Sequence, residues 1–213
     1  MAGAEQIWTI VVGGGSGRRF GTAKQYETLG DVRVIDRSIA IAREVSDGVV
    51  VVVSPQDADR VSGGATRSES VRAGLAAVPP EATIICVHDA ARPLASVDLY
   101  RRSIAAVIAG ADAAIPVLPV SDTIKVVADG IVVSTPDRAS LVAVQTPQAF
   151  RAGALRDAHA HGGDATDDAA LVEDRGGMVV VVDGEITNRK ITVPDDLDWA
   201  RGQIASPLDE EQP

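Results

Sequence analysis

Short runs of apolar, mostly β-branched residues recur along this chain, and they place the strongest limit on its fold. The clearest runs are IWTIVV at residues 7–12, VVVVV at 49–53, TIICV at 83–87 and MVVVVDG at 178–184. They do not alternate with polar residues, which is typical of strands buried on both faces of a parallel sheet. Segments with helical spacing or helix caps lie between the runs, at residues 34–45, 70–77, 96–109 and 151–161. This order predicts an α/β fold with a mostly parallel, twisted sheet flanked by helices.

The remaining segments are less regular. Residues 113–120 begin as a strand and continue into an excursion, after which residues 131–138 and 141–150 have β character. We expect a loop over 54–67, a short strand at ITVP (191–194) and a last helix over 195–204. Ser96 is expected to cap the helix that follows it, and Thr166 to cap a helix over the acidic segment TDDAALVED.

Composition limits the possible functions. The 213 residues carry a net charge of −10, which disfavours general binding to nucleic acid or to a membrane surface, since both need a positive field. We expect a single domain over residues 1–205 and a disordered acidic tail over 206–213. Cys86 is the only cysteine and has no disulfide partner, which fits a reducing cytoplasm. No signal peptide and no membrane-spanning run is visible.

Polar clusters follow three of the expected strands. GGGSGRR follows the first strand, HDAARP follows Val87 and DGEITNRK follows Val182. Ligands of open α/β sheets bind beyond the carboxyl ends of the strands, where these clusters should meet. Three clusters at one edge indicate a binding site there.

The first cluster has the features of a phosphate-holding loop. Its glycines allow backbone N–H groups to approach an anion, and Arg18, Arg19 and Lys24 add positive charge. The loop matches neither the dinucleotide pattern GxGxxG nor the P-loop pattern GxxxxGK followed by Ser or Thr. The missing dinucleotide pattern and the cations disfavour a nicotinamide-dependent oxidoreductase.

Other residues have a functional and a structural interpretation. Asp89 is either a helix cap or turn former, or a ligand for a magnesium ion that bridges phosphates. Arg92 suits a second anion, and the glycine turn at Gly63 and Gly64, with Ser70, suits a flat base. His88 is more typical of a structural residue. From their local sequence alone, Thr123, Arg138 and Thr146 are more typical of solvated positions in an extended segment, and Lys190 is compatible with a solvated strand edge.

Eight motifs in a fixed order make the pattern specific. They are GSGRRFG…KQY, GGxxRxxSV, VHDAARPL, LPVSDTIK, TPDR, AVQTPQAF, TDDAALVE and NRKITVPDDL. Over about residues 7–204 the chain therefore resembles the 2-C-methyl-D-erythritol 4-phosphate cytidylyltransferase family of the non-mevalonate isoprenoid pathway. The resemblance implies a Rossmann-like nucleotidyltransferase fold with a protruding β-arm.

The resemblance also implies an activity and a site. The substrate's phosphate oxygen would attack the α-phosphorus of CTP, with Mg²⁺ as cofactor and pyrophosphate as leaving group. Arg19 and Lys24 would stabilise the α-phosphate, and Arg138 and Lys190 would place the attacking phosphate. The nucleotide would be bound by Gly13, Gly14, Gly15, Gly17, Gly64, Ser70, Asp89 and Ala90. The sugar-alcohol phosphate would be bound by Asp89, Arg92, Thr123, Arg138, Thr146 and Lys190, with Asp89 also serving as metal ligand.

The resemblance further implies a homodimer formed through the arm, at about residues 119–142. Thr123, Arg138 and Thr146 would then serve the partner's active site. Two related functions remain open at this stage. One is a ribitol-5-phosphate cytidylyltransferase, which shares most of these motifs, and the other is a non-catalytic regulator that binds CTP without turnover.

Overall fold

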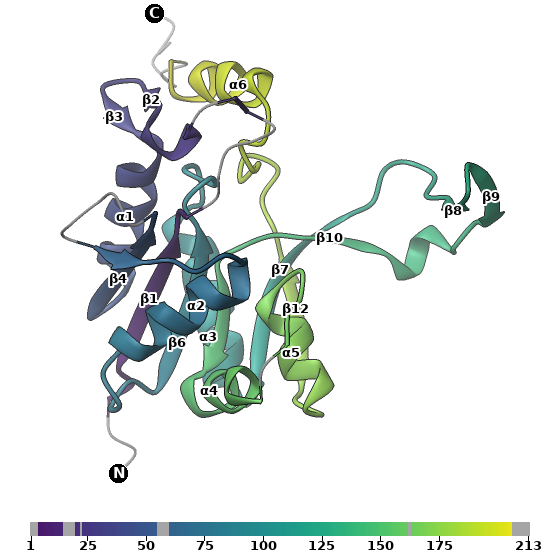
Figure 1. Cartoon of the computed structure of the whole chain (residues 1–213). Coiled ribbons are helices and arrows are strands. Elements are labelled where there is room, and N and C mark those ends of the chain that lie inside the picture. Colours follow the sequence, from purple (N-terminus) through teal and green to yellow (C-terminus); the bar gives the residue numbers. More distant parts are fainter. Residues whose placement is uncertain (1–3, 15–19, 22, 55–59, 162, 206–213) are drawn as a thin grey trace, which may run out of the picture.

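An eight-stranded sheet forms the centre of the computed structural model, which describes residues 4–14, 20–21, 23–54, 60–161 and 163–205 (Figure 1). Its strand order is β10-β7-β11-β6-β1-β4-β5, and β12 pairs with β7. The strands are β1 (Ile7–Val12), β4 (Gly48–Val53), β5 (Val61–Ser62), β6 (Ile84–Asp89), β7 (Ala113–Pro119), β10 (Val142–Val144), β11 (Gln148–Arg151) and β12 (Val179–Asp183). The predicted fold class is confirmed, because β1 pairs in parallel with both β4 and β6, and β12 pairs in parallel with β7.

Helices cover both faces of the sheet (Figure 1). They are α1 (Val34–Val45), α2 (Arg67–Ala77), α3 (Val97–Ile108), α4 (Ala152–Ala160), α5 (Asp168–Asp174) and α6 (Pro194–Ala205). Successive strand residues point to opposite faces, so Ile10 joins one core cluster and Val11 the other. The cluster containing Ile10 includes residues of α2, α4 and α5, and the cluster containing Val11 includes residues of α1 and α3. This arrangement explains why the strand sequences are apolar throughout.

A smaller cluster lies between α6 and a short hairpin. The hairpin consists of β2 (Thr28–Leu29) and β3 (Val32–Arg33), which precede α1. Leu29 and Val34 pack there with Ile191, Leu197 and Ala200. The C-terminal part of the described chain is therefore held beside the first strands, and the segment before α6 passes near the polar end of β6.

An arm leaves the sheet between β7 and β10 and projects away from the rest of the chain (Figure 1). It contains a hairpin of β8 (Val126–Ala128) and β9 (Ile131–Ser134), followed by the short 3-10 helix η2 (Arg138–Ser140). The protruding β-arm implied by the resemblance is confirmed. The predicted boundary of a single domain at residue 205 stays a prediction, and the expected tail lies outside the described residues.

Several local expectations were wrong. ITVP is not a strand, because the backbone N–H groups of Thr192 and Val193 donate to Asp196 Oδ2 and the segment leads into α6, which begins at Pro194. Asp167, not Thr166, caps α5, since the Asp167 carboxylate accepts from Ala170 N at 3.1 Å. The expected loop over 54–67 contains β5, which extends the sheet beyond β4.

Two further observations concern the direction of the strands and the length of the described helices. β10 and β11 run antiparallel to β7, and β11 also runs antiparallel to β6, so the sheet is mixed. None of the described helices is long and apolar enough to cross a membrane.

Candidate active site

The polar segments that follow β1, β4 and β6 lie close together, at the carboxyl ends of these strands. Gly13 donates its N–H to Val52 O at 2.7 Å, and Ala90 donates its N–H to Val12 O at 2.9 Å. A Cβ atom added to Gly13 would lie 3.1 Å from Ile35 Cδ1 and 3.3 Å from Ala90 Cβ. The backbone after β1 therefore passes close to the turn after β6, where only a small residue fits.

The glycine turn before α2 lies against Ser70. Gly64 donates its N–H to Ser70 Oγ at 3.2 Å, and that hydroxyl donates to Thr66 O at 3.0 Å. A Cβ atom added to Gly14 would lie 3.6 Å from Ser70 Oγ. The structure thus places Gly14, one of the expected phosphate-loop glycines, beside the expected base-recognition residues Gly64 and Ser70.

Thr66 fixes the start of α2 with a reciprocal cap. Thr66 Oγ1 accepts from Glu69 N at 3.2 Å, while Glu69 Oε2 accepts from Ala65 N at 2.6 Å and from Thr66 N at 3.2 Å. Such a capping box satisfies N–H groups that have no partner within the helix. The helix therefore begins at Arg67, three residues earlier than the sequence pattern predicted.

Asp89 is the charged centre of this edge. Lys190 Nζ lies 2.6 Å from Asp89 Oδ2, and Arg67 Nε lies 3.4 Å from Asp89 Oδ1. Burial alone would raise the pKa of the Asp89 carboxyl, but the attraction of Lys190 and then Arg67 outweighs it and holds this pKa well below its usual range. Asp89 is therefore an ionised carboxylate with a cation on each oxygen.

Thr146 and His88 support Asp89 from within the sheet. Asp89 donates its N–H to Thr146 Oγ1 at 3.0 Å, and the same hydroxyl lies 3.2 Å from His88 Nδ1. Burial lowers the pKa of His88 to about 4, an effect that nearby Asp89 opposes and Arg92 reinforces. The expectation of a structural His88 fits this geometry. Thr146 lies at the site, but its hydroxyl contacts Asp89 of its own chain, which differs from the expectation that it serves the partner's active site.

Arg92 and the loop that carries Lys190 are joined by a buried polar network. Arg92 NH1 donates to Asn188 O at 2.7 Å, and NH2 donates to Val144 O at 3.3 Å. Gln145 Nε2 donates to Glu185 O at 2.8 Å, and Asn188 Nδ2 donates to Thr146 O at 2.9 Å. These contacts bind the loop between β12 and α6 to the base of the arm, so that Lys190 reaches Asp89.

Lys24 lies in the short 3-10 helix η1 (Lys24–Tyr26), near the start of α6. Burial would raise the pKa of the Asp196 carboxyl, but backbone N–H groups of Val193 and Thr192, then Arg189 and Lys24, lower it. Lys24 is therefore close to the segment that follows Lys190. Gly15, Gly17 and Arg19, together with Arg18, lie outside the described residues.

The structure does not bring Thr123 and Arg138 to Asp89 of the same chain. Both are exposed residues of the arm, and Arg138 NH1 donates to Ser121 O at 2.6 Å within it. Figure 1 shows the arm running away from β1 and β6. Within one chain, the site therefore contains the nucleotide-side residues and Lys190 but lacks these two arm residues.

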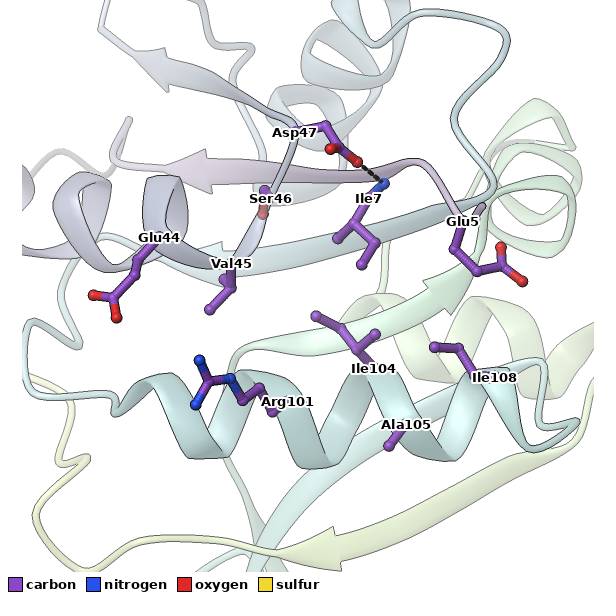
Figure 2. A pocket seen from close by; sticks show the side chains of 10 residues that line it. All are labelled: Glu5, Ile7, Glu44, Val45, Ser46, Asp47, Arg101, Ile104, Ala105 and Ile108. Carbon is purple, nitrogen blue, oxygen red and sulfur yellow. Dashed lines mark hydrogen bonds between the residues drawn. The ribbon is translucent and has the colours of Figure 1, made fainter. Parts of the chain in front are cut away.

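A cleft lies at the opposite end of the sheet from Asp89. It has a volume of about 490 Å³ and is lined by Glu44, Asp47 and Arg101 among others (Figure 2). Asp47 Oδ2 accepts there from the N–H of Ile7, the first residue of β1. Because Asp89 lies at the carboxyl end of β6, this cleft is not part of the candidate site.

Sequence reasoning missed some residues of the site. Arg67 entered the sequence analysis only as the arginine of the motif GGxxRxxSV, and Asp168, Gln145 and Asn188 were not proposed as site residues. The signal for Arg67 was the Thr-x-x-Glu pattern TRSE, which places it in the first turn of α2. The contacts of the other three with Arg67, Glu185 and Thr146 join positions at least 40 residues apart in sequence, and no local pattern reports such contacts.

Asp89 is suited to hold Mg²⁺ only together with a nucleotide. The described residues contain no group of three or more His, Cys, Asp or Glu side chains able to hold a metal ion. Mg²⁺ commonly binds to one or two carboxylates plus substrate phosphates and keeps several waters. One ionised carboxylate beside a phosphate-binding loop fits that donor set.

Comparison with known proteins identifies a family that matches almost the whole chain. The family model described as 2-C-methyl-D-erythritol 4-phosphate cytidylyltransferase (IspD) matches residues 7–205. A curated protein of that name from Syntrophotalea carbinolica is 41% identical, with 95% of this chain and 98% of the relative covered. A bifunctional enzyme IspD/IspF from Anaeromyxobacter dehalogenans is also 41% identical, but this chain spans only 59% of it.

Solved structures show the same relationship. The 4-diphosphocytidyl-2C-methyl-D-erythritol synthase of Anaerococcus prevotii matches with a TM-score of 0.83 and 29% identity, covering 95% of this chain and 99% of that one. The 2-C-methyl-D-erythritol 4-phosphate cytidylyltransferase of Thermus thermophilus matches with a TM-score of 0.80 and 32% identity, covering 92% of this chain and 98% of that one. Sequence and structure therefore point to the same group of enzymes.

Proposed function

This chain belongs to the 2-C-methyl-D-erythritol 4-phosphate cytidylyltransferase family, and we propose that its site works by holding CTP and the acceptor phosphate between fixed charges. The enzyme transfers CMP from CTP to 2-C-methyl-D-erythritol 4-phosphate and releases pyrophosphate, a step in the synthesis of isoprenoid precursors. The phosphate oxygen of the acceptor forms its bond to the α-phosphorus in line with the bond to pyrophosphate, which breaks. Catalysis of such a transfer rests on positioning and on stabilising charge.

The ion pair between Lys190 and Asp89, which lies beside the glycine turns, is the observation that supports the proposed role of each residue. Gly13 and Gly14 bring backbone close to the triphosphate, with Gly15, Gly17 and Arg19 continuing the same loop. Ser70 beside Gly14, Gly64 bonded to Ser70, and Ala90 beside Gly13 contact the cytidine. Lys24 and Arg19 stabilise the charge that develops on the α-phosphate.

Mg²⁺ is proposed to bind Asp89 and the nucleotide phosphates, where it neutralises phosphate charge. Lys190 has a side chain that is 42% exposed, so it can leave Asp89 Oδ2 and turn towards the acceptor phosphate. Arg92 and Thr146 complete the acceptor site on the same side of Asp89. Lys190 thus has two roles, pairing with Asp89 before the substrates bind and holding the acceptor phosphate afterwards.

Thr123 and Arg138 are proposed to act in a second copy of the chain. The arm that carries them exposes apolar side chains, including Val127 at 56%, Ile131 at 69% and Val133 at 58%. Isolated apolar residues on a surface are ordinary, but a projecting hairpin lined with them is suited to an interface. A homodimer through the arm buries these residues and brings Arg138 to the partner's acceptor phosphate.

A reducing, cytoplasmic location is proposed as well. It rests on the single cysteine, Cys86, which is buried and unpaired. Because no other cysteine is present, an oxidising compartment would bring no stabilising disulfide within the chain.

The first experiment is pyrophosphate release with Mg²⁺ and CTP, in parallel with 2-C-methyl-D-erythritol 4-phosphate and with ribitol 5-phosphate. We expect turnover with the first acceptor and not with the second. Turnover with ribitol 5-phosphate alone would contradict the acceptor while keeping the nucleotide site. CTP binding with neither turnover would instead favour a regulator.

A further inference from the structure

We infer that Arg67 is a positioning residue for Asp89, and that Asp168 and His159 hold Arg67 in place for this purpose. This inference rests on the proposed nucleotide site at Asp89 and gives a role in it to Arg67, Asp168 and His159, none of which was assigned one from the sequence. It is carried by a chain of contacts that runs from the interior of the molecule to the site.

Four side chains form the chain of contacts. His159 Nε2, on α4, lies 3.0 Å from Asp168 Oδ1, on α5. Arg67 NH1, on α2, donates to Asp168 Oδ2 at 2.7 Å, and Arg67 Nε donates to Asp89 Oδ1 at 3.4 Å. Three helices are thereby linked to the end of β6, where the nucleotide is expected to bind.

The burial of these groups argues against a role in stability alone. The Asp168 side chain is fully buried and that of His159 is 2% exposed. Removing charges from water is costly, and apolar residues of similar volume commonly stabilise a core as well or better. A buried ionic chain that ends at the site edge is better explained by its effect on Asp89.

The position of Arg67 supports the same conclusion. It is the first residue of α2, where the positive end of the helix dipole disfavours a cation. Asp168 and Asp89 supply the opposing charge, and together they keep the pKa of Arg67 above its usual value despite burial. With NH1 fixed on Asp168, the planar guanidinium directs Nε to Asp89.

Consequently, the two cationic side chains that contact Asp89 differ in how far they can move. Lys190 is 42% exposed and sits on a long flexible side chain, whereas Arg67 is 22% exposed and held by a buried carboxylate. When Lys190 leaves to bind the acceptor phosphate, Arg67 keeps Asp89 oriented and its charge compensated. Supporting contacts of this kind typically change affinity or activity about 10- to 100-fold when they are lost.

Asp168→Asn gives the sharpest test, because two explanations predict opposite signs. The variant removes a negative charge near an anionic nucleotide, so simple electrostatics predicts tighter binding of CTP. If Asp168 instead positions Arg67, the variant should bind CTP more weakly. The asparagine amide has only one acceptor oxygen for the two groups, Arg67 and His159, that contact this side chain. We expect the affinity for CTP with Mg²⁺, measured by titration calorimetry without acceptor, to fall about 10-fold or more.

Asp174→Asn is the matched control, because it makes the same charge change at the exposed end of α5. Its CTP affinity should equal that of the wild type. Unchanged or tighter binding of CTP by the folded Asp168→Asn variant would overturn the inference.

Arg67→Lys provides a second test that keeps the net charge. It does not require the protein to fold with a substitution at the buried Asp168. A single ammonium group cannot replace the fork that reaches Asp168 and Asp89 from different nitrogens. We expect CTP affinity and kcat/KM to fall about 10-fold or more, with no further loss in the double variant with Asp168→Asn. Arg72→Lys, on the same helix with its guanidinium on Gly163 O, should leave both unchanged.

Wild-type affinity and turnover in Arg67→Lys would overturn the inference, as would independent losses in the double variant. The proposed function is tested separately by the wild-type enzyme. If the wild type binds CTP but turns over no acceptor, the function is wrong, while the pattern of CTP affinities still decides the role of Arg67.

Discussion

Lys190 is the residue on which most of the proposed chemistry depends, since it lies 2.6 Å from Asp89 and is half exposed. We expect Lys190→Met to lower kcat about 100- to 1,000-fold, because one group directed at transferred charge is lost. The fold should survive, since Lys190 lies outside the core clusters. Steady-state kinetics and circular dichroism measure the two effects.

Arg189→Met is the control for that substitution. Its guanidinium lies 2.8 Å from Asp196 and over the Trp199 ring, so it faces α6 and not Asp89. Its kcat should stay close to that of the wild type. A folded Lys190→Met enzyme with nearly wild-type kcat would remove Lys190 from the reaction.

Cys86 gives a prediction for alkaline pH. Burial raises the pKa of its thiol to about 12 from the ordinary value of 9.0, although a hydrogen bond with Thr9 opposes the shift. The unfolded chain loses this proton above about pH 9 while the folded chain keeps it, so the stabilisation is complete below pH 9 and is lost as pH rises towards 12. The free energy of unfolding should therefore fall by up to about 1.4 kcal/mol per pH unit from this group.

Cys86→Ala should remove that contribution. Urea unfolding at several pH values between 9.5 and 11 compares the slopes of the two proteins. Burial and then Cys86 also raise the pKa of Tyr100, so the difference in slope reports the Cys86 thiol together with its effect on Tyr100. Equal slopes would show that the thiol ionises as easily when folded as when unfolded.

At the scale of elements, α2 is the helix whose start shapes the site. Thr66→Ala removes the acceptor for Glu69 N and should lower the free energy of unfolding by about 1 kcal/mol. Thr66→Ser keeps the hydroxyl and should cost much less. Urea unfolding of both variants measures the difference, and equal stabilities would show that the cap does not hold the helix.

The elements that sequence predicted best were those whose pattern is local. The apolar strands β1, β4 and β6 and the cap of α3 at Ser96 follow from residues within one segment. The segment ITVP was wrongly read as a strand, because its β-branched residues say nothing of Asp196, which accepts its N–H groups. Local propensity was overridden there by a contact with the helix that follows.

The residues of the site likewise divide into those that local sequence predicts and those that only the fold brings together. The glycines and Asp89 were predictable, since turns and strand ends have local signals and the motifs resemble a known family. The contact between Arg67 and Asp168 spans 101 positions, so only the folded chain reveals it. The assigned roles of Arg19, Gly15 and Gly17 stay predictions, because these residues lie outside the described part of the chain.

At the scale of the whole molecule, the proposed dimer through the arm would make the active site a shared one. Lys190 reaches Asp89 within its own chain, whereas Arg138 lies on the projecting arm. A dimer in which each arm serves the partner would contain two sites, each built from both chains. This arrangement predicts that two inactive variants can restore one another.

Co-expression of Lys190→Met with Arg138→Ala tests the prediction. In the mixed dimer one site carries both defects and the other carries neither, because the intact Lys190 and the intact Arg138 then meet. Purified mixed dimers should have roughly half of the wild-type activity, and the unsorted, randomly paired mixture roughly a quarter, from chains that are each nearly inactive alone. Turnover of CTP with the acceptor phosphate, measured on separately tagged and purified mixed dimers, reports the result.

Lys190→Met co-expressed with Asp89→Asn is the matched control. Both residues belong to the same chain's half of the site, so every site in that mixed dimer keeps one defect and no activity should return. Recovery in the first pair alone requires that Arg138 cross to the partner, because no arrangement within a single chain separates the defects. Failure in both pairs, with dimers present, would mean that Arg138 acts in its own chain or not at all, and would leave the arm an interface without a catalytic part.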